Sequence, residues 1–319
     1  MIIYIFLVSI GFYLLIRGSD VFVNGISQAA INLKIPKLVI SLTIVAFGTS
    51  TPELFIAFRG ILSGNNDIVM ASVIGSTIAN ILLIIGVSTM IKPIKVKNET
   101  IKKQLPFHFL IISIFTILFL DEIFANSVNT ISRSDASIII LIFTGFIYYI
   151  YSFNKNNNFY REFNKVTPQI SLPKSLLYAL IGLIILYFGS KLTVDNCIYI
   201  ANSLNINQKI ITMITIVIGS ATPELIMAIT SIKKNEFDIM IGNIIGTNIF
   251  NIGFVLALPV LILGNISSTS FNLIDMLVLV TSAFSIYVFA KDDKKIDKAE
   301  GLTMLFIFIL YYIYILFIQ

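Results

Sequence analysis

The sequence has few charged residues, no tryptophan and a single cysteine. Only 12% of its 319 residues are Asp, Glu, Lys or Arg, whereas 57% are hydrophobic, and the mean hydropathy is +0.93. Soluble domains carry roughly 25% charged residues, so this composition excludes a pair of them. The lone Cys197 excludes an internal disulfide, and without Trp any interfacial aromatic belt must consist of Tyr. The sequence therefore predicts a polytopic membrane protein.

Ten apolar runs follow one another with short polar breaks between them. Most are close to the roughly 20 residues that cross about 30 Å of hydrocarbon, and their continuous apolarity favours helices over the alternating strands of a β-barrel. No basic segment precedes the first run and no small-residue cleavage site follows it, so we interpret it as a retained span. We expect an all-α membrane protein with spans at Ile2 to Ile16, Leu38 to Phe58, Ile68 to Ile91, Phe107 to Leu120, Ala136 to Phe153, Leu176 to Phe188, Ile210 to Ile232, Ile239 to Leu263, Phe271 to Ala290 and Leu302 to Ile318.

The basic residues lie mainly in alternate gaps between these runs. The even-numbered gaps hold only Arg59, Arg133, Lys191 and Lys209, and the odd-numbered gaps hold most of the rest. By the positive-inside rule the odd gaps are cytoplasmic, which predicts a multi-pass protein of the cell membrane with both termini extracellular. The net charge of +5 thus follows from membrane topology, and we expect a lipid bilayer and no nucleic acid as the partner.

The two halves of the chain repeat each other at an offset of 171 residues. The sequence T-P-E-L at 51–54 returns at 222–225, and the Gly and Asn of 75–80 return within 246–251. Each half holds five predicted spans, an odd number, so the second half enters the membrane from the opposite side. We expect two inverted five-helix repeats, at residues 1–153 and 175–319, joined by a cytoplasmic linker at 154–174.

Glu53 and Glu224 are the repeated ionisable residues inside apolar runs. An ionised carboxylate near the bilayer centre costs about 2.5–3.5 kcal/mol, so two of them at symmetric positions require a cation. Each Glu follows a Pro, which lacks an N–H and clashes with the preceding turn. We therefore expect the helices to open near Gly48 and Gly219, which would free backbone carbonyls for the cation.

The next predicted span of each half supplies a second wall. Ser76 and Asn80 are four residues apart, as are Thr247 and Asn251, so each pair shares a helical face. All of these groups are hydroxyls or amides, and none is Cys or His. Such ligands favour the hard cations Ca²⁺ and Na⁺ over soft transition metals.

The paired motifs resemble those of the sodium/calcium exchanger family, and most closely its short prokaryotic members. The first copy reads G-T-S-T-P-E at 48–53 with G-S-T-I-A-N at 75–80, and the second reads G-S-A-T-P-E at 219–224 with G-T-N-I-F-N at 246–251. The resemblance covers essentially the whole chain. It implies central Ca²⁺ ligands at Glu53 and Glu224 with the carbonyls of Thr49 and Ser220, flanking Na⁺ ligands at Ala46, Val217, Thr49, Ser50, Ser76 and Ser220, and Asn80 and Asn251 at the middle.

Three positions depart from the family pattern. Ser220 stands where Thr is usual, Ala221 removes one hydroxyl, and Asn251 stands where sodium-coupled relatives often have Asp. The charge of the core is then fixed by two Glu residues, which balance one Ca²⁺ or two Na⁺. The coupling ion is therefore left open among Na⁺, H⁺ and K⁺.

The expected function is exchange of Ca²⁺ for Na⁺ by alternating access. A proton- or K⁺-coupled antiporter of the same fold is the near alternative, and a passive cation channel is the alternative from another class. A membrane enzyme is not expected, because no nucleophile, His/Asp pair or phosphate loop is present. We expect no cofactor and no obligate protein partner, with Ca²⁺ and Na⁺ as substrates.

Other polar residues receive structural interpretations. Asp67 and Asp238 stand at span entrances, where a carboxylate favours the helix dipole. We interpret His108, at the start of the fourth span, as an interfacial residue. The small and polar segments at 18–20 and 189–191 predict either a hinge or interfacial capping at the ends of the first and sixth spans.

Overall fold

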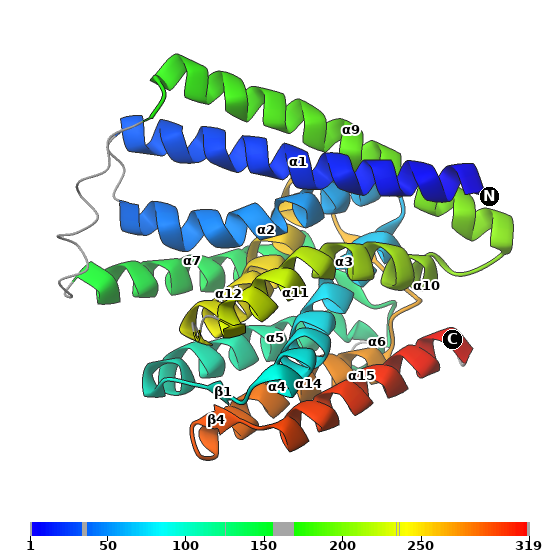
Figure 1. The fold of residues 1–319 in the computed structure, drawn as a ribbon. Helices are drawn as coiled ribbons and strands as arrows, with labels where there is room; N and C mark the ends of the chain where they lie inside the picture. Colours follow the sequence, from blue (N-terminus) through cyan, green and yellow to red (C-terminus); the bar gives the residue numbers. More distant parts are fainter. Residues whose placement is uncertain are drawn as a thin grey trace.

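The chain folds into a bundle of helices linked by short loops. A computed structural model describes residues 2–33, 37–124, 126–155, 169–233, 235 and 237–317, although side chains at several helix positions, including 37–49 and 218–220, lie outside the description. The described α-helices are α1 (Ile2–Asn32), α2 (Lys37–Leu62), α3 (Asn66–Ile78), α4 (Gly86–Ile91), α5 (Leu105–Phe119), α6 (Asp121–Phe124), α7 (Arg133–Lys155), α9 (Leu172–Leu204), α10 (Gln208–Thr212), α11 (Ile218–Lys233), α12 (Phe237–Phe250), α13 (Ala257–Leu263), α14 (Leu273–Lys291) and α15 (Lys298–Phe317) (Figure 1).

Short π-helical turns connect several of these helices without a loop. The described ones are η1 (Ala79–Ile85), η2 (Thr100–Gln104), η4 (Met213–Val217) and η5 (Asn251–Leu256). Within the described residues, seven helical stretches are long and apolar enough to cross a membrane by length and composition. The expectation of a mostly helical membrane protein is therefore confirmed, whereas the full count of ten spans in two inverted repeats stays a prediction.

Helices α1 and α9 are much longer than the apolar runs that predicted them. The runs end at Ile16 and Phe188, yet α1 continues to Asn32 and α9 to Leu204. The segments at 18–20 and 189–191 therefore lie within continuous helix, so the expectation of a cap there is wrong, whereas the hinge stays a prediction. At 1.5 Å per residue α1 is about 46 Å long, more than the hydrocarbon layer needs, so both helices must tilt or extend beyond it.

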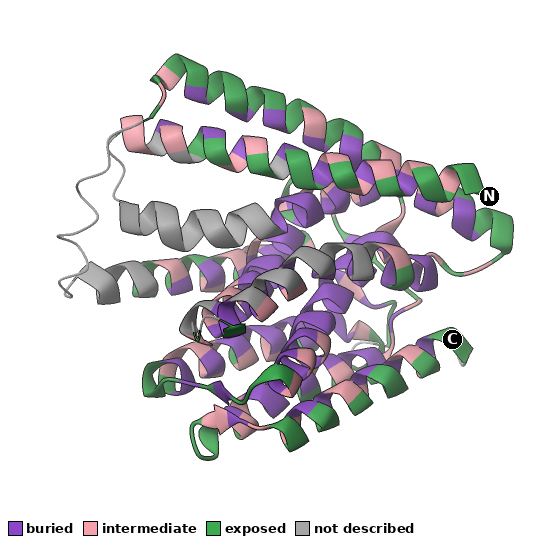
Figure 2. Cartoon of the chain, in the orientation of Figure 1, coloured by how far each residue is buried: buried purple, intermediate pink, exposed green. Residues whose placement is uncertain are grey.

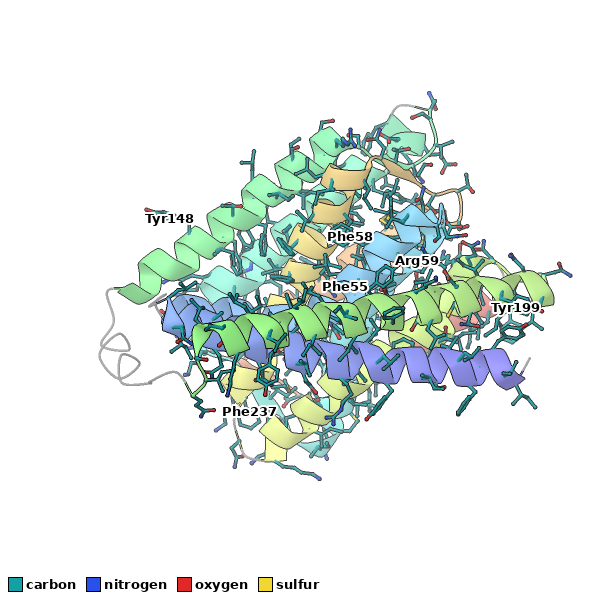
Figure 3. All side chains as sticks on the ribbon, turned by 90° about the horizontal axis from the view of Figure 1, so that it is seen from above. Phe55, Phe58, Arg59, Tyr148, Tyr199 and Phe237 are labelled. Carbon is teal, nitrogen blue, oxygen red and sulfur yellow. The ribbon has the colours of Figure 1, made fainter. Side chains whose placement is uncertain are left out.

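Glycines let α1 and α9 pack side by side in opposite directions along the edge of the bundle (Figures 1 and 3). A Cβ added at Gly182 would collide with the backbone N of Phe22, and one added at Gly11 would collide with Oγ1 of Thr193. Small residues at a membrane helix interface allow this close approach. Tyr4 and Tyr199 stack at the far end of the pair, with ring centroids 3.8 Å apart. A second apolar cluster, distinct from the main core, centres on this pair and includes Ile56 of α2, Ile68 of α3 and Ile211 of α10.

The centre of the bundle is formed by two stretches at equivalent positions of the halves. In the stretch α3–η1–α4, 94% of the most apolar window is buried, and 78% in α12–η5–α13, compared with 24% in α1 and 22% in α15. Figure 2 shows exposed residues along the outer sides of α1, α9 and α15. Many of them are large and apolar, including Phe6, Leu180 and Phe306, as expected for surfaces that face lipid.

Loops at the two ends of the bundle contact partners of the same gap parity. Strand β1 (Ile94–Lys95) pairs antiparallel with β4 (Lys295–Ile296), which joins the third gap to the ninth. Strand β2 (Thr130–Ile131) pairs with β3 (Ile266–Ser267), which joins the fourth gap to the eighth. Figure 1 shows both chain ends on the same side of the bundle. Such pairings are expected of a chain that crosses the membrane repeatedly, because gaps of the same parity then lie on the same side of the membrane.

Helix α2 does not open where the sequence predicted a break. Its backbone is helical from Lys37 to Leu62 with Pro52 inside, so the expectation of an opening near Gly48 is wrong. In the second half, the π-helical turn η4 runs directly into α11, and the backbone stays helical at Gly219. A proline removes one hydrogen bond, and a packed membrane helix absorbs that loss without unwinding.

Candidate cation site

The two repeated glutamates lie buried on facing parts of the bundle. Glu53 is carried by α2 and Glu224 by α11, and their side chains are 3% and 5% exposed. The two carboxylates are close enough to interact electrostatically. Two negative charges brought together away from water repel each other, so a cation bound between them would stabilise this arrangement.

Three buried oxygens of the repeated motifs have no hydrogen-bond partner among the described residues. They are Oε2 of Glu224, Oγ of Ser50 and Oδ1 of Asn251. Ser50 and Asn251 are fully buried. A buried oxygen without a partner costs free energy, and a cation is the ligand that would satisfy several of them at once.

Hydrogen bonds join the polar side chains of α3 and η1 in the first half to those of α12 and η5 in the second half. Nδ2 of Asn251 donates to Oγ of Ser76 over 3.1 Å, and Nδ2 of Asn80 donates to Oδ1 of Asn248 over 2.9 Å. Gly75 allows η4 to pack closely, since a Cβ there would lie 2.6 Å from Cγ2 of Val217. The structure thus brings Ser76, Asn80 and Asn251 together at the centre.

The two predicted amides also share a backbone feature that sequence reasoning missed. Asn80 lies in η1, and Asn251, at the equivalent position of the second half, opens η5. A π-helical turn widens the helix locally and is frequent at functional sites. Neither turn carries a proline, so the sequence offered no signal for them.

His108 was a further residue that sequence reasoning misjudged. Its side chain is fully buried in α5, so the interfacial interpretation is wrong. Nε2 of His108 lies 3.3 Å from Nδ2 of Asn248, the residue that also binds Asn80. The sequence places His108 near the start of an apolar run, and hydropathy alone does not reveal which helix covers that end.

The remaining predicted residues divide into two groups. Thr247 and Val217 are buried in the same region, on α12 and η4. The side chains of Ala46, Thr49 and Ser220 lie outside the described residues, so their roles stay predictions. Within the part of the chain that the structure describes, no three His, Cys, Asp or Glu side chains cluster as a metal site.

Comparison with known proteins follows the same division into halves. The model of the sodium/calcium exchanger protein family matches residues 3–152 and 174–317. The chain belongs to the sodium/calcium exchanger family. It is similar to inner membrane protein YrbG of Escherichia coli, with 32% identity over 80% of this chain and 79% of the relative. It is also similar to the sodium/calcium exchanger MaX1 of Methanosarcina acetivorans, with 23% identity over 97% of both chains.

Solved structures of the sodium-calcium exchanger NCX_Mj are similar over nearly their whole length. The form soaked with 10 mM Na⁺ and no Ca²⁺ has a TM-score of 0.64 and 30% identity, covering 97% of this chain and 98% of that one. Family membership and this fold support a Ca²⁺ antiporter in a multi-pass membrane protein.

A polar hollow opens where the even-numbered gaps meet. Its volume is about 490 Å³, and it is lined by residues 64–67, 206–208 and 267–269. Asp67 stands in the first turn of α3 and accepts hydrogen bonds from the hydroxyls of Ser268 and Ser270, at 2.5 Å each. These contacts agree with the structural interpretation of Asp67. For Asp238 the side chain lies outside the described residues.

Proposed function

We propose that this member of the family exchanges Ca²⁺ for Na⁺ across the cell membrane by alternating access. The observation that carries the proposal is the pair of buried carboxylates, Glu53 and Glu224, in a chain whose repeated motifs also hold buried oxygens without partners among the described residues, at Ser50 and Asn251. Their total charge balances one Ca²⁺ or two Na⁺. Both ions compete for the same carboxylates, so the return of an empty site is disfavoured and the two gradients are coupled.

The proposed architecture is two inverted five-helix repeats with the site at their interface. It is supported by the separate family matches of the two halves, by the equivalent π-helical turns at Asn80 and Asn251, and by the parity of the loop contacts. In an inverted repeat the two halves can exchange conformations, and the site then opens to the opposite side of the membrane. We propose the α1–α9 pair as the layer that moves, because most residues of the apolar cluster that it forms belong to the pair itself and lie apart from the main core.

Proton coupling is the second candidate, and two observations favour it. Ala221 is buried in α11 and supplies no hydroxyl, and Asn251 donates to Ser76 as a neutral amide instead of offering a carboxylate. Fewer charged or hydroxyl ligands weaken the case for several simultaneous Na⁺ ions. The cation site for Ca²⁺ is common to both candidates.

Flux measurements in proteoliposomes separate the candidates. Uptake of Ca²⁺ is followed while a Na⁺, K⁺ or pH gradient is imposed in turn, and we expect the Na⁺ gradient to drive it. Flux driven by protons and indifferent to Na⁺ would refute the choice of coupling ion, whereas flux that needs no counter-gradient would refute antiport. Glu53→Gln and Glu224→Gln should each abolish exchange while the protein stays folded, and activity in both would remove the site.

A further inference from the structure

We propose that His108 is a positioning residue which, through Asn248, holds the side-chain oxygen of Asn80 toward the transported cation. The inference rests on the proposed cation site and adds a residue that the repeated motifs do not contain. Three helical segments meet in this relay: α5 carries His108, α12 carries Asn248 and η1 carries Asn80.

The relay is buried along its whole length. His108 and Asn248 have no exposed surface, and Asn80 is 2% exposed. Nδ2 of Asn80 donates to Oδ1 of Asn248 over 2.9 Å, and Nδ2 of Asn248 faces Nε2 of His108 over 3.3 Å. Away from water these groups have few other partners, so each one sets the orientation of the next.

The direction of the hydrogen bonds fixes the imidazole tautomer. An asparagine amide accepts at its oxygen and donates at its nitrogen. Because Oδ1 of Asn248 is used by Asn80, the Asn248 nitrogen is turned to His108 and must donate to Nε2. Nε2 therefore carries no hydrogen, and the proton of the neutral ring is on Nδ1. In this orientation Oδ1 of Asn80 is left for the site.

One other orientation is self-consistent, and it would spoil the site. If Nε2 carried the hydrogen, both amides would turn over, and Asn80 would present its NH₂ group to the cation. Only the orientation with Nε2 as acceptor offers an oxygen there. Nδ1 of His108 has no partner among the described residues, so an N–H at this atom is costly. A cation on the Asn80 oxygen offsets that cost.

The equivalent amide of the second half is held differently. Asn251 donates to Ser76, whose hydroxyl in turn donates to the carbonyl of Val73 over 3.2 Å. A hydroxyl can rotate to accept or donate, so it does not impose one amide orientation. His108 thus acts on Asn80 alone, and the relay belongs to one side of the site.

The first test reads the tautomer directly. His108 is the only histidine of the chain, so ¹⁵N-histidine labelling of the full-length protein gives the signals of one imidazole without assignment. With saturating Ca²⁺ we expect Nε2 to show the signal of an unprotonated ring nitrogen and Nδ1 that of an N–H. A protonated Nε2 would overturn the proposal. This readout needs no transport, so it stands apart from the outcome of the flux experiment.

The second test separates positioning from packing. H108Q places an oxygen acceptor near the position of Nε2, whereas H108N is also a neutral amide but too short to reach Asn248. We expect H108N to raise the KM for Ca²⁺ about tenfold with a smaller change in kcat, and H108Q to restore it. T116V, on the same helix and outside the relay, is the control and should leave KM unchanged. Equal impairment of H108Q and H108N, or wild-type KM in H108N, would overturn the proposal.

Discussion

Replacing Lys209 with methionine should strongly destabilise the protein, because the buried carboxylate of Asp275 loses its ion-pair partner. Lys209 is the second residue of α10 and is 1% exposed. Its Nζ donates to Oδ2 of Asp275 over 2.6 Å and to the carbonyl of Ser270 over 2.9 Å. The same ammonium lies 4.3 Å from the ring centroid of Phe271. Removing one partner of a buried ion pair typically costs about 3–5 kcal/mol.

The magnitude depends on what remains around the carboxylate. Asp275 has no exposed surface and still accepts from the hydroxyl of Tyr311 over 2.8 Å and from the backbone N of Asn272 over 2.8 Å. These two donors support the negative charge but do not neutralise it. We therefore expect a loss near the lower end of that range, about 3 kcal/mol.

The assay is reversible unfolding of the detergent-solubilised chain, followed by the free energy of unfolding. The double variant K209M/D275N removes both charges and should recover part of the loss, because no unpaired charge stays buried. K295M is the matched control: its pair with Asp297 is 41% and 45% exposed, so the loss there should be below about 1 kcal/mol. A K209M loss no larger than that of K295M, or a double variant less stable than K209M, would refute the reasoning.

Two further predictions concern the α1–α9 layer. Arg59 of α2, which is labelled in Figure 3, forms an ion pair with Asp195 of α9. Its Nη2 lies 2.7 and 2.9 Å from the two carboxylate oxygens, and both side chains are partly exposed. R59Q and D195N should each change the ratio of forward to reverse exchange by about two- to fivefold. Additive effects of the two substitutions in the double variant would contradict a shared contact. G182V should slow exchange more than it lowers Tm, because the added atoms meet the backbone of Phe22, while G145V in α7, where a Cβ meets nothing within 4 Å, should leave the exchange rate unchanged.

Features set by composition and repetition were predictable from the sequence. The helical runs were predictable from hydropathy. A membrane helix makes its backbone hydrogen bonds internally and needs apolar side chains along its length, so it is recognisable as a long apolar segment. Glu53 and Glu224 stand out because an ionisable residue inside an apolar segment is energetically costly and marks a functional site. Two such residues at the offset of the repeat indicate one common function. The structure buries both of them with Ser50, Ser76, Asn80 and Asn251, as their motifs indicated.

Features that depend on how helices face each other were not predictable. The continuation of α1 beyond Gly18 depends on the neighbouring α9, which covers that segment: a Cβ at Gly18 would lie 3.0 Å from Leu186. The uninterrupted course of α2 through Pro52 depends on packing that compensates one lost hydrogen bond. The link from His108 to the site arises only because α12 places Asn248 between α5 and η1. None of these three features leaves a periodic pattern in the sequence.

The two halves of the site are therefore similar in ligands and different in support. The residue at the position of the first half that corresponds to Asn248 is Thr77, and its hydroxyl donates to the carbonyl of Val73 in its own helix, over 2.8 Å. Among the described residues Thr77 makes this hydrogen bond within its own helix and none to a neighbouring helix, so the relay through Asn248 has no counterpart beside Asn251. In the proposed cycle the two halves exchange roles as the site opens to one side and then to the other. A fixed Asn80 oxygen and a rotatable contact at Asn251 then present the cation with one rigid and one adaptable ligand. Ca²⁺, which tolerates variable coordination, is served by such a pair in both states.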